Sequence, residues 1–338
     1  MKRVIVTGGY GFIGSNLIRL LLSKNFKVLN IDILSYSSQK YNLKDIKKKN
    51  YNFCKLDINN QTQILKTIKK FKPNGIFNLA ADTHVDRSID NPYPFIKNNV
   101  LGVYNLLEAI RKYKKRVKLI HISTDEVYGD ILGSKRSNEN FPYTPSSPYS
   151  ATKASSDHLI YSYVRTYGID AVISNCSNNY GPRQFPEKLI PKMIYNILHN
   201  KTLPIYSTGK NSREWIYVDD HCEALLKLYY KGIKGEKYNI GSGINCSNII
   251  LVKKIIGVFK KKKYKMGTKV KIQFVKDRPG HDFRYALDSR KIKKLLKWYP
   301  KTNLSTGILK TVNWYINNQS FFSKISKKLF LKRLGQSD

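Results

Sequence analysis

The sequence is poor in cysteine and has no long apolar run, and each shortage excludes a class of protein. Its four cysteines, Cys54, Cys176, Cys222 and Cys246, stand far apart and form neither a disulfide framework nor a metal-binding pattern. We therefore expect a reduced, cytoplasmic compartment and no bound metal. No run of about 18 apolar residues occurs, so we expect no membrane-spanning helix.

Acidic residues are also scarce, because 23 Asp and Glu stand against 61 Lys and Arg, a formal net charge of +38. Such an excess can mark a nucleic-acid or anionic-lipid partner. Here the excess is nearly all lysine and is spread along the whole chain, with its densest run at 260–263. We interpret it as solvated surface that would help attract an anionic ligand, and expect neither a nucleic-acid nor a membrane partner.

The first two-thirds of the chain alternates short apolar runs with amphipathic stretches, which predicts an α/β fold with a Rossmann-type, doubly wound parallel sheet. Beyond residue 180, turns and shorter elements indicate a smaller C-terminal, ligand-binding lobe. We expect the sheet domain over 1–180, completed by segments near 214–241, the lobe over 181–320, and a basic tail over 321–338. The predicted strands are 4–7, 28–31, 53–56, 76–78, 119–123 and 171–174, and the predicted helices are 15–23, 61–71 and 99–113.

A glycine cluster, VTGGYGFIGSN, follows the first predicted strand directly. Gly8, Gly11 and Gly14 permit a tight turn and close approach to a pyrophosphate, which the following helix N-terminus can bind. Asp32 ends the second strand, where a carboxylate accepts hydrogen bonds from an adenosine ribose and repels a 2′-phosphate. No arginine follows in DILSYSSQK, so we predict NAD rather than NADP. Asp57 closes the third strand, where it can face the adenine, cap the next helix, or do both.

Tyr149 and Lys153, in SPYSATKASSDH, stand four residues apart and would share one face of a helix. An ammonium group near a phenol favours the phenolate, so we expect the tyrosine pKa to fall from about 10 and the tyrosine to serve as a base. Taken alone, the pair could equally be an exposed Tyr and Lys on any helix.

The stretch HISTDEVYGD places Asp125 and Glu126 where a buried strand ends. Two carboxyl groups in one enclosed site resist ionising together, so one can stay an acid while the other acts as a base. Adjacent side chains on extended backbone point apart, and we expect each to address a different part of a bound molecule. The alternative is a solvent-facing pair or a helix cap.

Together these stretches resemble the extended short-chain dehydrogenase/reductases that act on nucleotide sugars and, more narrowly, the dTDP-glucose 4,6-dehydratases. The resemblance covers residues 1 to about 316 and implies an NAD-dependent hydro-lyase of deoxysugar (for example rhamnose) biosynthesis, acting as a homodimer paired through helices 99–113 and 149–167. The stretches that match in order are TGGYGFIGSN, DTHVDRSI, STDEVYGD, SPYSATKASSDHL, NNYGPRQFPEKLIP, REWIYVDDH and DRPGHDFRYALD.

The resemblance also implies a role for each site residue. Tyr149 would take the proton from the C4 hydroxyl of dTDP-glucose while hydride passes to NAD, Glu126 would remove the C5 proton, and Asp125 would protonate the leaving C6 hydroxyl. Hydride then returns to C6 and a proton returns to C5, which gives dTDP-4-keto-6-deoxyglucose. The implied catalytic residues are Thr124, Asp125, Glu126, Tyr149 and Lys153; the cofactor residues are Gly8, Gly11, Phe12, Ile13, Gly14, Asp32, Asp57, Ile58, Leu79, Ala80, Ala81, Asn98, Tyr149, Lys153 and Asn179; the substrate residues are Thr83, Thr124, Asn178, Lys188, Leu189, Pro204, Ile205, Tyr206, Arg213, Asn248, Asp277, Arg278, Pro279, Gly280 and His281.

One departure leaves the nucleotide base open. Ser207 follows LPIY, where the family commonly has glycine, and UDP-glucose 4,6-dehydratases share the acidic pair. The sequence is also compatible with an epimerase or decarboxylase of the same fold and, from a different class, with a catalytically silent dinucleotide-binding protein whose basic surface contacts RNA or membrane. His84 and His281 have no third ligand spaced to join them, so we expect hydrogen-bonded loop residues rather than metal ligands.

Overall fold

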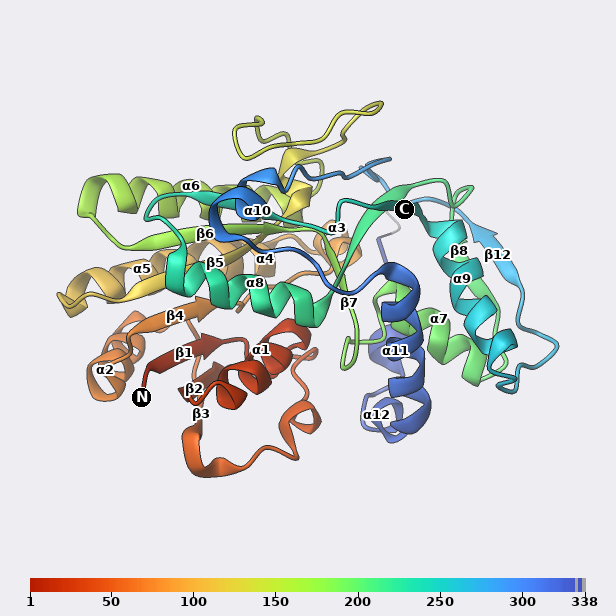
Figure 1. The fold of residues 1–338 in the computed structure, drawn as a ribbon, viewed down its shortest axis with the longest axis horizontal. Coiled ribbons are helices and arrows are strands. Elements are labelled where there is room, and N and C mark those ends of the chain that lie inside the picture. The colour runs from red at the N-terminus through yellow and green to blue at the C-terminus, as the bar shows by residue number, and fades with distance from the viewer. Residues whose placement is uncertain (332–333, 336–338) are drawn as a thin grey trace.

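The computed structural model describes residues 1–331, 334 and 335. Its centre is a parallel seven-stranded sheet in the order β10-β6-β5-β4-β1-β2-β3, which confirms the predicted Rossmann-type fold (Figure 1). Strands β4 and β5 are buried on both faces, which is why they read as apolar runs. The strands are β1 (Arg3–Thr7), β2 (Lys27–Asp32), β3 (Tyr51–Lys55), β4 (Gly75–Asn78), β5 (Lys118–Thr124), β6 (Ala171–Cys176) and β10 (Lys237–Ile240).

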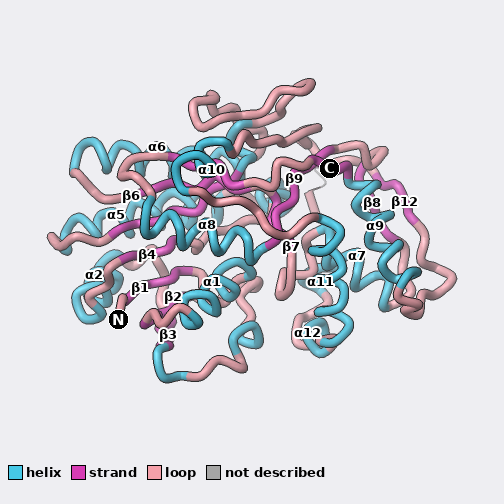
Figure 2. Tube along the Cα trace, viewed as in Figure 1, coloured by secondary structure: helices cyan, strands magenta, loops and turns pink. Residues whose placement is uncertain are grey.

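Helices cover both faces of this sheet (Figure 2). In α2, for example, Ile64, Ile68 and Phe71 recur at helical spacing and are buried on one stripe. One face carries α1 (Phe12–Ser23), α8 (Val218–Lys231) and α10 (Arg290–Leu296), and the other carries α2 (Gln61–Phe71), α5 (Gly102–Tyr113) and α6 (Pro148–Tyr167). Short turns of helix are η1 (Lys40–Leu43), η2 (Lys48–Asn50), α3 (Val85–Asp90), α4 (Tyr93–Phe95), the π-helix η3 (Ile96–Leu101) and the 3₁₀-helix η4 (Asp125–Tyr128).

The second lobe lies beside the sheet, at the right of Figure 1. It contains the sheet β11-β9-β7, the pair β12-β8 and a helical layer around a separate apolar core. Its strands are β7 (Asn178–Tyr180), β8 (Leu203–Tyr206), β9 (Ser212–Tyr217), β11 (Asn245–Ser247) and β12 (Ile272–Val275), and its helices are α7 (Leu189–Leu198), α9 (Asn248–Lys261), α11 (Leu304–Asn317), α12 (Ser320–Ser323) and α13 (Lys328–Leu331).

Three details differ from the expected elements. Of the segments near 214–241, only β10 joins the main sheet, whereas β9 pairs with β7 and β11. The predicted helix 99–113 becomes α-helical only at Gly102, after the π-helix. The tail expected over 321–338 is partly core, because Phe321, Phe322 and Phe330 are buried in the second lobe; residues 332–333 and 336–338 of that tail lie outside the described residues.

This topology fixes where a ligand can bind. The strand order reverses between β1 and β4, and a crevice forms at the carboxyl ends of the strands at such a switch point. In the part of the chain described by the structure, no helix has the length and apolar character needed to cross a membrane.

Candidate active site

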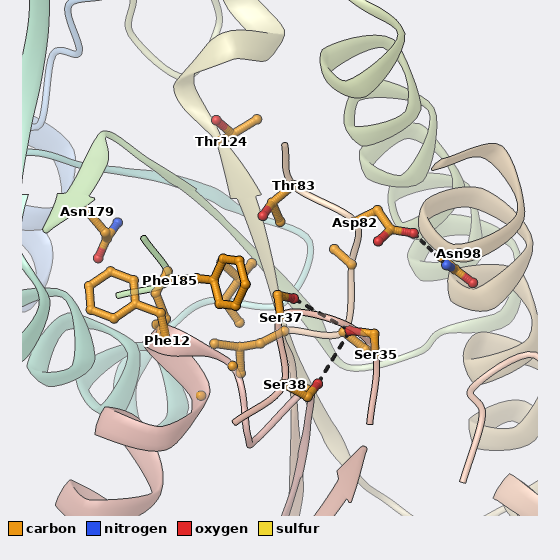
Figure 3. Close-up of a pocket in the computed structure, with 18 of the residues that line it drawn as sticks. Phe12, Ser35, Ser37, Ser38, Asp82, Thr83, Asn98, Thr124, Asn179 and Phe185 are labelled. Atoms are coloured by element: carbon orange, nitrogen blue, oxygen red, sulfur yellow. Dashed lines mark hydrogen bonds between the residues drawn. The ribbon is translucent and has the colours of Figure 1, made fainter. Parts of the chain in front are cut away.

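A cavity of about 280 Å³ opens at the carboxyl ends of the parallel strands. One side is formed by loops after β1, β2, β4 and β5 and by the start of α6, and the other by residues 176–188, which lead into the second lobe (Figure 3). The predicted residues that line it are Gly8, Gly11, Phe12, Ile13, Gly14, Asp32, Asp57, Ile58, Leu79, Ala80, Ala81, Thr83, Asn98, Thr124, Asp125, Glu126, Tyr149, Lys153, Asn178, Asn179 and Lys188.

The glycine loop forms a cradle that side chains would fill. Gly8 has a φ of +67°, and a Cβ there would lie 2.9 Å from the backbone nitrogen of Ala80. A Cβ on Gly14 would collide with the Gly8 carbonyl oxygen and lie 2.8 Å from the Cα of Gly9. No side chain caps the N-terminus of α1 at Gly11, so its first N–H groups are available to an anion.

Asp32 organises the loop after β2. Its Oδ2 accepts a hydrogen bond from the backbone N–H of Tyr10 at 2.9 Å, and its Oδ1 accepts from the N–H of Leu34 and the hydroxyl of Ser38, both at 2.7 Å. The buried carboxylate therefore holds the glycine loop and the following loop together while it lines the cavity.

Asp57 lies at the cavity wall but does not cap the next helix. The Oδ1 of Asn60 accepts from the N–H of Gln63 and caps α2 instead. Asp57 accepts from the backbone and side-chain N–H groups of Asn59, and the same Asn59 amide donates to Asn98 at 3.1 Å. The capping alternative is therefore wrong, and Asp57 lines the cavity.

The acidic pair does not lie on extended backbone. Strand β5 ends at Thr124, whose hydroxyl accepts from the N–H of Glu126 and so caps the 3₁₀-helix that holds both acids. Asp125 is buried, its Oδ1 accepts from the Thr124 hydroxyl at 3.3 Å, and its Oδ2 has no hydrogen-bond partner. The expectation of an extended pair is wrong because the cap turns the chain immediately after the strand.

Their surroundings distinguish the two carboxyl groups. Burial, followed by the charge of Glu126, raises the pKa of Asp125 well above its ordinary value. Burial also raises the pKa of Glu126, but the positive charges of Arg278, Arg213 and Lys188 oppose that rise. Asp125 is therefore the group that more readily keeps a proton.

Tyr149 and Lys153 share a buried face of α6, but their electrostatics differ from expectation. Burial, followed by the charge of Glu126, raises the pKa of Tyr149 well above its ordinary value. Lys153 Nζ donates to the carbonyl of Ile122 at 2.7 Å and lies 3.1 Å from Nε2 of His121. The predicted lowering of the tyrosine pKa is wrong for this state, because the ammonium is held by the strand and burial dominates.

A buried polar network behind Lys153 was missed by the sequence analysis. The His121 ring lies 3.1 Å from the Asn78 amide through Nδ1 and 3.7 Å from Asp157 through Nε2. Oδ2 of Asp157 accepts from Ser123 at 2.8 Å. Burial lowers the pKa of Lys153 to about 8, an effect that the charge of Asp157 opposes.

Most of the predicted nucleotide-end residues lie outside the cavity, in the adjoining lobe. Arg278 pairs with Asp86 at 2.6 Å, and Asp86 also accepts from the Tyr206 hydroxyl at 2.7 Å. Arg213 donates to backbone carbonyl groups and lies over the ring of Tyr285 rather than pairing with a carboxylate. The predicted residues that do not line the cavity are Leu189, Pro204, Ile205, Tyr206, Arg213, Asn248, Asp277, Arg278, Pro279, Gly280 and His281.

Several cavity residues were not predicted. Asp82 accepts from the amide of Asn98 at 2.6 Å and lies on the wall with it (Figure 3). Two groups of these residues could have been predicted from the sequence, because they belong to stretches already assigned to the site. These are the serines in the loop after Asp32 and Glu187 in FPEKLIP. The main additions are Ser35, Ser37, Ser38, Asp82, Ser123, Cys176, Ser177, Gln184, Phe185 and Glu187.

The donor set fits a dinucleotide. The cavity combines a cradle free of side chains, an uncapped helix N-terminus and the buried carboxylate of Asp32, and its wall includes the unpartnered Oδ1 of Asn178. Among the residues that the structure describes, no group of three His, Cys, Asp or Glu side chains could hold a metal ion.

Comparison with known proteins gives a consistent result. The family model described as GDP-mannose 4,6 dehydratase matches residues 5–311. A probable dTDP-glucose 4,6-dehydratase from Sinorhizobium fredii is 46% identical, over 98% of both chains. A crystal structure of dTDP-glucose 4,6-dehydratase from Bacillus anthracis in complex with NAD is 39% identical with a TM-score of 0.88, over 96% of this chain and 100% of that one. Another, from Streptomyces venezuelae with NAD and TYD bound, is 38% identical with a TM-score of 0.89 and the same coverage.

Proposed function

The chain belongs to the dTDP-glucose 4,6-dehydratases, within the GDP-mannose 4,6 dehydratase family, and from this premise we propose that it converts dTDP-glucose into dTDP-4-keto-6-deoxyglucose. The observation that carries the proposal is that Asp125, Glu126 and Tyr149 line the same cavity as the glycine loop. Oxidation, loss of water and reduction at one sugar need an acid, a base and a dinucleotide within one enclosed site.

Several residues would hold NAD. The glycine loop and the N-terminus of α1 would bind the pyrophosphate, Asp32 would bind the adenosine ribose, and Asp57 with Ile58 would contact the adenine. Asn98 and Asn179 would contact the nicotinamide half. When bound, NAD supplies a hydride acceptor and, in its oxidised ring, a positive charge that favours the Tyr149 phenolate.

The proton transfers are then divided among the chain's own residues. Tyr149 takes the proton of the C4 hydroxyl, and the C4 oxygen of the sugar stays hydrogen-bonded to the Thr124 hydroxyl. Glu126, which faces three cationic side chains, ionises and removes the C5 proton that the C4 ketone has made acidic. Asp125 keeps its proton, whose place is the unpartnered Oδ2, and gives it to the leaving C6 hydroxyl. Separate surroundings thus give adjacent carboxyl groups opposite roles.

The nucleotide end belongs to the second lobe. Arg213, Arg278 and Lys188 supply cationic groups for the diphosphate. Asn248 has a buried Oδ1 without a partner, as Asn178 does, so each offers an acceptor to a ligand. The remaining proposed substrate contacts are Thr83, Leu189, Pro204, Ile205, Tyr206, Asp277, Pro279, Gly280 and His281.

We also propose a homodimer and a cytoplasmic location. The large side chains of Ile96, Leu101, Tyr104, Tyr161 and Tyr167 are exposed on η3, α5 and α6, and a second copy would cover such a face through a two-fold axis. All four cysteines are free, which suits a reducing compartment.

The direct test is incubation of the purified protein with dTDP-glucose and, separately, with UDP-glucose. We expect a 4-keto-6-deoxy product from dTDP-glucose, detected by its absorbance in alkali and by mass spectrometry. Faster turnover of UDP-glucose would reassign the nucleotide, and a change only at C4 would indicate an epimerase. If both sugars stay intact while the protein holds oxidised NAD, the proposed function is wrong.

A further inference from the structure

Two loops that line the cavity are joined directly by Tyr36 and Glu187. The loop after β2 contributes Ser35, Ser37 and Ser38 to the wall, and the loop before α7 contributes Gln184, Phe185, Glu187 and Lys188 (Figure 3). The hydroxyl of Tyr36 donates to Oε1 of Glu187 at 3.0 Å. The Tyr36 ring also meets Phe185 edge to face, with centroids 5.7 Å apart.

Arg87, from α3, completes the connection. Its Nε donates to Oε2 of Glu187 at 3.1 Å, so both carboxylate oxygens are held by residues of the sheet domain. Its guanidinium lies 4.1 Å from the centroid of the Tyr36 ring, and its Nη2 donates to the carbonyl of Leu329 at 2.7 Å. The Glu187 side chain is only 6% exposed, and a carboxylate at that depth is costly unless it is paired in this way.

The connection lies beside the adenosine end of the cavity. Ser38, two residues after Tyr36, donates to Asp32 at 2.7 Å, so displacement of Tyr36 pulls on the loop that surrounds the ribose carboxylate. Movement of the loop before α7 away from the sheet domain would break the Tyr36–Glu187 and Arg87–Glu187 contacts together and expose a buried charge. Opening of this wall is therefore opposed by charge-assisted hydrogen bonds.

We propose that Tyr36, Glu187 and Arg87 form a latch that keeps the dinucleotide bound while it is in its reduced form, between the first and second hydride transfers. The inference rests on the proposed function, in which the cofactor that takes a hydride from C4 must be the one that returns it to C6. Tyr36 does not line the cavity, so it acts as a positioning residue through Glu187 and the loops.

The test measures cofactor release from the purified holoenzyme in Tyr36→Phe and Glu187→Gln. In the first assay, a second enzyme that consumes free NAD reports the rate at which bound NAD leaves the protein. In the second assay, NADH that escapes during turnover of dTDP-glucose is trapped and measured. For each variant we expect release roughly tenfold faster than in the parent protein, about the effect of one hydrogen bond to a charged group. The double variant should show less than the product of the two effects, because both changes break the same contact.

Tyr264→Phe is the matched control, since that hydroxyl donates to Asn313 Oδ1 at 3.1 Å within the second lobe, and its release rate should equal the parent rate. Unchanged release in Tyr36→Phe overturns the latch, and this variant decides the matter if Glu187→Gln does not fold. The NAD-release assay is run without sugar, so it does not depend on turnover. An unchanged release rate in an active enzyme refutes the latch alone, whereas faster release from a protein inactive on dTDP-glucose refutes the function alone.

Discussion

At the residue scale, the chemistry depends on two adjacent carboxyl groups that differ in their neighbours. Asp125 is buried with one oxygen unpartnered, whereas Glu126 faces the charges of Arg278, Arg213 and Lys188. The like charges raise the cost of ionising both groups in one enclosed space. These surroundings support Glu126 as the proposed base and Asp125 as the proposed acid, and each assignment can be tested by a change that keeps the shape of the side chain.

Replacing Glu126 by Gln removes the proposed base but leaves Tyr149 and the proposed cofactor residues intact. We expect exchange of the C5 hydrogen with deuterated water to fall at least about 100-fold, since a positioned base contributes about that much or more. Formation of NADH from C4 oxidation should persist in the same variant. Mass spectrometry of the recovered sugar measures the exchange, and exchange at the parent rate would exclude Glu126 as the base.

Replacing Asp125 by Asn removes the proposed proton donor for the leaving hydroxyl. Loss of water should slow by about 100-fold, while C4 oxidation slows much less, so that NADH absorbance accumulates before any product forms. Stopped-flow absorbance follows the first step, and product assay follows the second. Equal slowing of both steps would argue that Asp125 only shapes the cavity.

The charge of Lys153 sets a limit on the alkaline side. Burial lowers its pKa to about 8, so the rate of NADH formation should decline as the pH rises through about 8, where the ammonium is lost. In the unfolded chain the pKa of a lysine is about 10.4. Between about pH 8 and pH 10.4 the folded state therefore binds fewer protons at Lys153 than the unfolded state, and the contribution of Lys153 to stability increases as the pH rises through that range. Thermal unfolding measured in the same buffers separates the two effects, because lost activity without lost stability indicates titration.

At the element scale, apolar runs and amphipathic stretches predicted the sheet and its helices, often within one or two residues. The predictions failed where contacts with residues far away in the sequence determine the structure. For example, β9 has the composition of a strand, but the strands it pairs with, β7 and β11, lie in the second lobe and not in the main sheet. The 3₁₀-helix at Asp125 depends on the Thr124 cap, and the hydrogen bonds of Lys153 depend on His121 and the Ile122 carbonyl. The sequence therefore predicted many of the residues that line the cavity, but not the local backbone at Asp125 or the hydrogen bonds of Lys153.

The turn between β1 and α1 gives the prediction that belongs to this scale. In Gly14→Ala, the added methyl collides with the Gly8 carbonyl oxygen, so we expect the free energy of unfolding to fall by about 1–3 kcal/mol and bound NAD to be lost. The control is Gly257→Ala in α9, where a Cβ meets nothing within 4 Å and helix stability should rise by about 0.5–1 kcal/mol. Denaturant unfolding and the NAD content of the purified protein are the measurements, and a Gly14→Ala protein that retains NAD at parent stability would contradict this account of the turn.

At the scale of the whole molecule, the site exists only because the two lobes meet across the cavity. Asp86 pairs with Arg278, and Arg87 with Glu187, across long stretches of sequence. The chain also returns to the second lobe at its end, where Phe321, Phe322 and Phe330 fill the core. None of these pairings follows from local pattern, so the sequence predicted only a basic tail over 321–338 and not the burial of its three described phenylalanines in the second lobe.

The last property of the whole molecule is its assembly. Tyr104 and Tyr161 are exposed on the neighbouring helices α5 and α6, and in the proposed dimer the same face of a second copy covers them. Size-exclusion chromatography with light scattering should give twice the chain mass of 39.1 kDa for the parent protein and a single chain mass for Tyr104→Glu combined with Tyr161→Glu, because two buried carboxylates would oppose association. Tyr299→Glu, an exposed position after α10, should keep the parent mass. A double variant that remains at the dimer mass and retains NAD would place the interface elsewhere.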